Sequence, residues 1–341
     1  MATEDAAVGN KVHPLLVTLR YPEFGALIAV VVLGLFFGFM SPLFLSPGGV
    51  ANWTDVASTI GIVAVPVAML MIGGEFDLSA GVMVGSSGLL LGLLGTRAAL
   101  NIWPALVIVL LFAVGVGFIN GVVVVSTGLP SFIVTLATFL ILEGANLGVT
   151  KLLTGNVQVN GLETIPGYHS AFVAFGGTFS PWSFRVAVLW WIAITVVATL
   201  ILRRTRAGNW ILGVGGDATA ARTVGVPVNR VKVGLFMATS VAAALVGIIV
   251  ATRLASVIAT QGVGNEFMYI VCAVVGGTLL GGGYGSPIGA SLGATIVGMA
   301  FIGIQFAGWN TDWRFLFLGL ILLAAVLVNN ATRRGVERRQ R

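Results

Sequence analysis

Residues 103–125 read WPALVIVLLFAVGVGFINGVVVV, a stretch without a single charged side chain. A helix of about 20 mostly apolar residues is long enough to cross the hydrocarbon core of a bilayer. The whole chain has the same character, because 57% of its 341 residues are hydrophobic and only 9% are charged. Soluble domains carry about 25% charged residues. A soluble fold is therefore excluded, and the sequence predicts an all-α membrane protein.

Further apolar stretches repeat this pattern along the chain, so about ten transmembrane helices are predicted. The predicted spans are 24–45, 55–72, 79–96, 103–125, 131–149, 184–202, 231–253, 266–280, 287–306 and 313–328. Many of the 47 glycines lie inside these apolar stretches. Small residues let helices approach one another closely in lipid, so a tightly packed helical bundle is predicted.

The basic residues predict the orientation of the chain, because Lys and Arg are enriched in cytoplasmic flanks. With ten spans and a cytoplasmic N-terminus, 13 of the 18 Lys and Arg residues fall inside and 5 outside. Both termini are therefore predicted to be cytoplasmic, and the net charge of +6 reflects orientation, not nucleic-acid binding. The predicted parts are a cytoplasmic tail (1–23), a transmembrane domain (24–330) and a basic cytoplasmic tail (331–341). Within the domain, the long loops are external (151–183) and cytoplasmic (203–232).

Residues suited to metal or redox chemistry are few. The single cysteine, Cys272, lies in an apolar stretch and is interpreted as a packing residue. His13 and His169 lie far apart in polar flanks, which disfavours a metal site built on histidine. No nucleophile, base and orienting group recur at a spacing suited to catalysis. The chain is therefore not expected to be an enzyme or to hold a metal.

The segment 73–81, GGEFDLSAG, joins two predicted spans and puts two carboxylates next to or within the membrane. Ionisable groups there are costly, so they mark a function or a specific structural need. Asp77 or Ser79 would cap the following helix by accepting hydrogen bonds from its free N–H groups. Capping is favoured for Asp77, and a position lining a polar path across the membrane is the alternative. For Glu75 the two interpretations are balanced.

A second glycine-rich segment, 276–287, reads GGTLLGGGYGSP and also joins two spans. It lacks the GK[ST] ending of a phosphate loop, so nucleotide binding is not predicted. A tight break between helices is predicted instead, with Thr278 as a candidate path residue. Because this break and the one at Gly73 both precede a helix rich in small residues, they suggest an internal duplication. Small residues at four-residue spacing predict close helix packing at Gly81 and Gly85, at Gly117 and Gly121, and at Gly285, Gly289 and Gly293.

Several other polar residues lie inside the predicted spans, and each is interpreted first as an interhelical hydrogen bond and second as a ligand contact. They are Asn120, Thr135, Thr138, Glu143, Asn146 and Gln305. Together they make a polar interior plausible. The candidates for a polar path are Glu75, Asp77, Ser79, Asn120, Asn146, Thr278 and Gln305.

The cytoplasmic loop predicts a short helix of its own. Asp217 is a suitable N-cap, 218–224 is compatible with a helix, and Gly225 is a suitable stop. A short capped helix that projects between spans indicates a docking partner. The alternative is an interfacial helix that lies on anionic lipid.

Three segments resemble the permeases of ribose- and xylose-type sugar importers in the ATP-binding-cassette (ABC) superfamily. The segment 73–81 is similar to the family signature GGIDLSVG. The segment 213–232, GVGGDATAARTVGVPVNRVK, is similar to the family's cytoplasmic segment, and 276–294, GGTLLGGGYGSPIGASLGA, to its GGTSLxGGxGxxxGTxxGA pattern. Order and spacing match as well. The sequence departs from the family by having Glu75 and Phe76 where a single apolar residue usually precedes the Asp.

The resemblance implies a type II ABC-importer-like bundle in a bacterial inner membrane, forming the path for a sugar or sugar-like solute. It implies a second permease copy, two ATP-binding subunits that hold ATP and Mg, an external solute-binding protein, and no cofactor on this chain. The segment 217–225 would be the coupling helix that docks on the ATPase, with Asp217, Ala221, Arg222 and Gly225 as its candidate residues. A branched-chain amino-acid permease and an ion-coupled carrier remain open as alternatives.

Overall fold

The computed structural model describes residues 23–179 and 181–339, and within them eight helices are long and apolar enough to cross a membrane. These are α2 (Glu23–Met40), α3 (Pro47–Ile72), α4 (Ser79–Thr96), α5 (Ile102–Thr127), α6 (Ser131–Thr154), α8 (Val186–Arg204), α11 (Val228–Leu254) and α13 (Pro287–Phe306). The apolar helix α12 (Asn265–Val275) is shorter, and α14 (Arg314–Arg339) follows α13. Each predicted span overlaps one of these ten helices, so the all-α membrane fold is confirmed.

Two predicted spans are wrong at their ends. The span 24–45 is interrupted after Met40, where a separate 3-10 turn, η1 (Pro42–Leu45), begins with a proline. The span 266–280 is helical only as far as Val275, because Gly277 takes a left-handed φ of +89° that ends the helix. In contrast, α3 begins earlier than predicted, since the Ser46 hydroxyl accepts a hydrogen bond from the backbone N–H of Gly49 (3.1 Å) and caps it.

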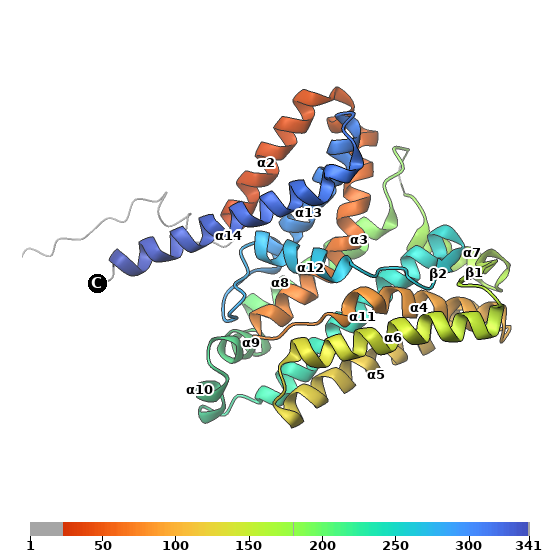
Figure 1. Ribbon diagram of the computed structural model, residues 1–341, viewed down its shortest axis with the longest axis horizontal. Coiled ribbons are helices and arrows are strands. Elements are labelled where there is room, and N and C mark those ends of the chain that lie inside the picture. Colours follow the sequence, from red (N-terminus) through yellow and green to blue (C-terminus); the bar gives the residue numbers. More distant parts are fainter. Residues whose placement is uncertain (1–22, 180, 340–341) are drawn as a thin grey trace, which may run out of the picture.

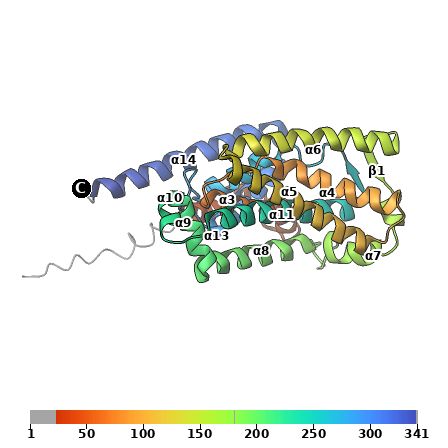
Figure 2. The same ribbon diagram turned by 90° about the horizontal axis from the view of Figure 1, so that it is seen from below.

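The two ends of the molecule carry different elements. The short helices α9 (Arg206–Gly216) and α10 (Ala218–Thr223) lie at the left end in Figure 1. At the opposite end lie α7 (Tyr168–Ala171) and the strands β1 (Gln158–Asn160) and β2 (Ser256–Ile258). Figure 2 shows the same separation after a 90° turn. The orientation predicted from the basic residues makes the first of these the cytoplasmic end and the second the external end, and the two ends are named in that sense below.

The external segment is folded onto the end of α11. β1 pairs with β2 in an antiparallel ribbon that aligns Val159 with Val257. Beyond it come the 3-10 turn η2 (Leu162–Thr164), α7 and the π-helical turn η3 (Phe172–Gly176), which packs against α11. The segment 151–183, predicted only as a loop, thus contains a short helix and a strand.

The long helices form an inverted repeat. α11 packs against α4 and α5, and α3 packs correspondingly against α12 and α13. α6 contacts α4 and α5 as α14 contacts α12 and α13. Asp55 near the start of α3 accepts hydrogen bonds from Arg253 near the end of α11 (2.7 and 2.9 Å), so these two central helices are antiparallel. In the duplication α3 is therefore the counterpart of α11. The prediction that the break at Gly73 is the counterpart of the break at Gly276 is wrong, because these breaks follow α3 and α12.

Glycines bring helices into backbone contact both between and within the two repeats. A Cβ atom placed on Gly117 or Gly121 of α5 would lie 2.6 or 2.7 Å from the Cα of Met237 or Val233 on α11. On α13, Gly289 and Gly293 lie against the carbonyl oxygens of Gly276 and Cys272. Gly81 and Gly85 of α4 face the carbonyls of Gly262 and Gln261 in the same way, and Gly285 contacts Thr278 and Ile72. All of the glycines predicted for helix packing thus lie at tight contacts.

Candidate functional site

The break between α3 and α4 is a tight glycine turn followed by a short segment without regular secondary structure. Gly73 keeps a helical conformation, Gly74 takes a φ of +85°, and the Glu75 N–H donates to the Leu70 carbonyl (3.1 Å). This pattern closes the C-terminus of α3 and requires glycine at the left-handed position. In the segment after it, the backbone N–H groups of Phe76 and Leu78 donate to two hydroxyls of α6, Ser131 Oγ (3.0 Å) and Thr135 Oγ1 (3.1 Å).

Asp77 is the centre of this break and is 1% exposed. Its Oδ1 accepts hydrogen bonds from the backbone N–H (2.8 Å) and the hydroxyl (2.5 Å) of Ser79, the first residue of α4. Its Oδ2 accepts one from the Thr239 hydroxyl of α11 (3.1 Å). Asp77 therefore caps α4, as the capping interpretation requires, and also links this helix to α11.

The hydrogen bonds continue from Ser79 into two further helices. Asn120 of α5 donates from Nδ2 to Ser79 Oγ (3.0 Å), and Thr138 of α6 donates to Asn120 Oδ1 (2.6 Å). The set Asp77, Ser79, Asn120, Thr138 and Thr239, named here the Asp77 network, joins α4, α5, α6 and α11. A buried polar chain with every member paired fixes the relative positions of the helices it connects.

Glu75 forms an ion pair with Lys232 near the start of α11. The side chains are 9% and 21% exposed, so the pair is largely shielded from solvent. The sugar-importer signature that this segment resembles has no carboxylate at the position of Glu75. In this chain Lys232 supplies a basic partner for that carboxylate. The break is thus held to α11 by one ion pair and one hydrogen bond.

The break between α12 and α13 repeats the same turn. Gly276 is helical, Gly277 is left-handed, and the Thr278 N–H donates to the Ala273 carbonyl (2.9 Å). Thr278 is 1% exposed, and its hydroxyl has no hydrogen-bond partner within the described residues. Both breaks therefore share one backbone geometry, although only the first has a buried carboxyl group.

The cytoplasmic loop contains the predicted capped helix, α10. Asp217 accepts hydrogen bonds from the backbone N–H groups of Thr219 (2.8 Å) and Ala220 (3.0 Å), and Gly225 takes a φ of +82° after the helix. Ala221 is buried against Val214 and Val228, whereas Arg222 is exposed and donates to Asn229 Oδ1 (3.2 Å). α10 thus has an apolar side on the protein and an exposed basic side available to a partner.

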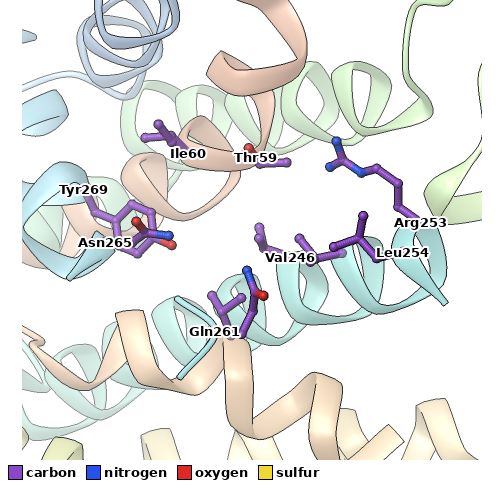
Figure 3. A pocket seen from close by; sticks show the side chains of 10 residues that line it. Thr59, Ile60, Val246, Arg253, Leu254, Gln261, Asn265 and Tyr269 are labelled. Atoms are coloured by element: carbon purple, nitrogen blue, oxygen red, sulfur yellow. The ribbon is translucent and has the colours of Figure 1, made fainter. Parts of the chain in front are cut away.

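A cavity of about 230 Å³ lies between α3, α4, α11 and α12, in the external half of the bundle. Figure 3 shows Thr59 above the cavity, Gln261 below it, Asn265 beside Tyr269 at the left and Arg253 at the right. Valines and Ile60 form much of the remaining wall. Since Asp55 already neutralises Arg253, the cavity offers uncharged hydrogen-bonding groups on an apolar wall, which suits a small neutral polar solute.

Comparison with known proteins places this geometry in a family. Residues 49–326 match the family model described as branched-chain amino acid transport system / permease component. The chain belongs to this permease family. A probable ABC transporter permease of Escherichia coli K12 is 33% identical over 90% of this chain and 89% of its own length. The xylose/arabinose import permease of Sulfolobus acidocaldarius is 31% identical (94% and 88% covered), and the ribose import permease of E. coli K12 is 30% identical (89% and 92%). No solved structure matches.

This permease is consequently a multi-pass membrane subunit of an ABC importer and not an enzyme. ATP hydrolysis takes place on separate ATP-binding subunits, and a substrate-binding protein completes the system. The family assignment decides against an ion-coupled carrier. What the chain itself must provide is a path for the solute and a contact that receives movement from the ATPase.

The structure brings together only some of the predicted path residues of the permease. Asp77, Ser79 and Asn120 share one network, and Glu75 is adjacent to it, whereas Thr278 belongs to the other break. Asn146 is 8% exposed and lies beside Gly85 of α4, and its Nδ2 has no hydrogen-bond partner in the part of the chain that the structure describes. Gln305 is exposed near the external end of α13, apart from the Asp77 network.

Sequence reasoning missed two partners of the break, Lys232 and Thr239, because both lie on α11, far along the chain. It also missed α9, for which a signal existed: Thr205 is a helix-capping residue, and its hydroxyl accepts a hydrogen bond from Gly208 N–H (3.3 Å). The polar cavity residues Gln261 and Asn265 lie in a loop and at a helix start, where no periodic pattern marks them.

Proposed function

We propose that this permease imports a sugar or sugar-like polar solute across a bacterial plasma membrane, working as a pair of identical copies. The observation that carries the proposal is the uncharged polar lining of the external cavity, by Thr59, Gln261 and Asn265, in a chain related to ribose and xylose/arabinose import permeases. Amide and hydroxyl groups exchange hydrogen bonds with the hydroxyls of a sugar, and the apolar wall contacts its C–H groups. The solute arrives from the external binding protein.

Coupling takes place at the cytoplasmic end. α10 docks on the ATP-binding subunit, which holds ATP and Mg²⁺, and the exposed Arg222 and the turn at Gly225 contact that subunit. Asp217 and Ala221 hold α10 in place, through the cap and the apolar contact described above. The candidate path residues near the two breaks line the route that opens when α10 moves.

The solute class is tested in proteoliposomes that contain the permease with its ATP-binding subunit and enclose ATP and Mg²⁺. Labelled ribose, xylose and leucine are added outside with the binding protein. Accumulation of a sugar that requires both ATP and the binding protein is the expected result. Accumulation of leucine instead would assign the branched-chain amino-acid class, and uphill transport by the permease alone on an ion gradient would overturn the proposal.

The double variant Arg222→Ala, Gly225→Ala is expected to lower the amount of solute imported per ATP hydrolysed by about 5–150-fold, the usual range for loss of coupling between two sites. ATP hydrolysis and membrane insertion are expected to persist, because the altered residues are exposed. Uptake and hydrolysis are measured in the same proteoliposomes. Arg204→Gln, an exposed cytoplasmic arginine at the end of α8, is the matched control and should leave the ratio unchanged.

A further inference from the structure

Glycines from three distant parts of the chain meet at one point on the cytoplasmic side. Gly74 follows α3, Gly215 and Gly216 end α9, and Gly282 and Gly283 lie between α12 and α13. The Gly283 N–H donates a hydrogen bond to the Ile72 carbonyl (2.8 Å), which joins the second break to the end of α3. We name these five residues the glycine junction.

Gly215 is the centre of the junction. A Cβ atom on this residue would overlap the carbonyl oxygen of Ile72 and lie 2.6 Å from the nitrogen of Gly283. A Cβ atom on Gly282 would lie 2.7 Å from the Gly215 carbonyl oxygen and 3.0 Å from the Cα of Gly74. The three chain segments therefore touch backbone to backbone, with no room for a side chain between them.

This type of contact transmits displacement directly. A side chain can absorb a small movement by changing its rotamer, but backbone atoms in van der Waals contact cannot, and packed protein is nearly incompressible. Gly216 is followed at once by Asp217, the cap of α10. Movement of α10 therefore reaches Gly215 through a single intervening residue and presses on both helix breaks together.

We propose that Gly215 is the positioning residue that passes the movement of α10 to both helix breaks, and so to both halves of the inverted repeat at once. The inference rests on the proposed docking of α10 to the ATP-binding subunit. One break continues into the Asp77 network and the other into α13, which lies against α3. A discrete shift at the junction thus has a defined route into the helices that surround the cavity.

The test measures cysteine labelling at the two breaks in the complex of permease and ATP-binding subunit. Reporter cysteines replace Phe76 in the first break and Leu280 in the second, each in a Cys272→Ser background that removes the natural thiol. Maleimide labelling rates are compared with and without ATP and vanadate. With the native junction, both rates are expected to change by about fivefold or more.

Gly215→Ala is expected to abolish the nucleotide-dependent change at both reporters while ATP hydrolysis continues. Gly213→Ala, in α9 but outside the junction, is the matched control, because the nearest atom of another segment to its Cβ would be the Ala221 Cβ at 4.0 Å; its response should equal that of the native junction. A purely structural role would reduce assembly, hydrolysis and labelling response in parallel. If Gly215→Ala does not assemble, Gly282→Ala alters the same contact from the opposite segment with a milder overlap and replaces it.

Each outcome has a distinct meaning. A full response at both reporters in an assembled Gly215→Ala or Gly282→Ala complex overturns the role of the junction. A response lost at one reporter only also overturns it, because the inference requires both breaks to move together. No nucleotide-dependent change with the native junction would instead contradict the proposed coupling through α10.

Discussion

Asp77→Ala is expected to destabilise the permease by about 2–6 kcal/mol, because it leaves two buried donors of Ser79 without an acceptor and each costs roughly 1–3 kcal/mol. The Thr239 hydroxyl is less affected, since it also lies 2.9 Å from the Phe236 carbonyl oxygen. The loss also removes the cap of α4. The measurement is the temperature at which the detergent-solubilised protein loses its monodisperse elution peak.

A graded series separates the structural role of Asp77 from a role in the path. Asp77→Asn keeps one acceptor oxygen for Ser79 and should be intermediate in stability. Thr138→Val, at the far end of the Asp77 network, leaves only Asn120 Oδ1 unpaired and should cost less than Asp77→Ala. Native stability in Asp77→Ala would contradict the capping role, and normal stability with lost uptake in Asp77→Asn would favour a solute contact.

Lys232→Met is expected to cost about 3–5 kcal/mol, because removing one partner of a shielded ion pair leaves the other charge unpaired. Glu75 is the less exposed member, at 9%, so its carboxylate bears most of this cost. The same unfolding measurement applies. Lys151→Met, at an exposed position near the end of α6, is the control for loss of a lysine and should change stability little.

The double variant Glu75→Gln, Lys232→Met completes a cycle that isolates the interaction between the two side chains. It is expected to recover most of the stability lost in Lys232→Met, because no buried charge remains. If the double variant is no more stable than Lys232→Met, the pair is not the reason for the loss. Recovery would explain how this chain accommodates a charge where the sugar-importer signature has an apolar residue.

The parts of the fold that depend on local sequence could be predicted. Apolar length alone located a helix in each of the ten predicted spans, and the spacing of Asp217 and Gly225 located α10. The capping role of Asp77 also followed from its place directly before a helix. These features are determined within a few residues, where hydrogen-bond and propensity rules apply.

The contacts that turn these elements into a site could not be predicted. Lys232 and Thr239 lie 157 and 162 residues after their partners Glu75 and Asp77. Nothing in the local pattern of α11 distinguishes these two residues from other polar residues in spans. The meeting of Gly215 with both breaks depends on how three segments pack, and single-sequence periodicity carries no information about such distant neighbours.

The central helices α3 and α11 are fastened at both ends. On the external side Asp55 binds Arg253, and on the cytoplasmic side Glu75 binds Lys232, with the acid contributed from α3 or its exit and the base from α11 in each case. Sliding of one helix along the other would rupture a bond at one end or the other. We therefore expect α3 and α11 to keep their positions relative to each other along their axes during the transport cycle, while the surrounding helices tilt relative to this pair.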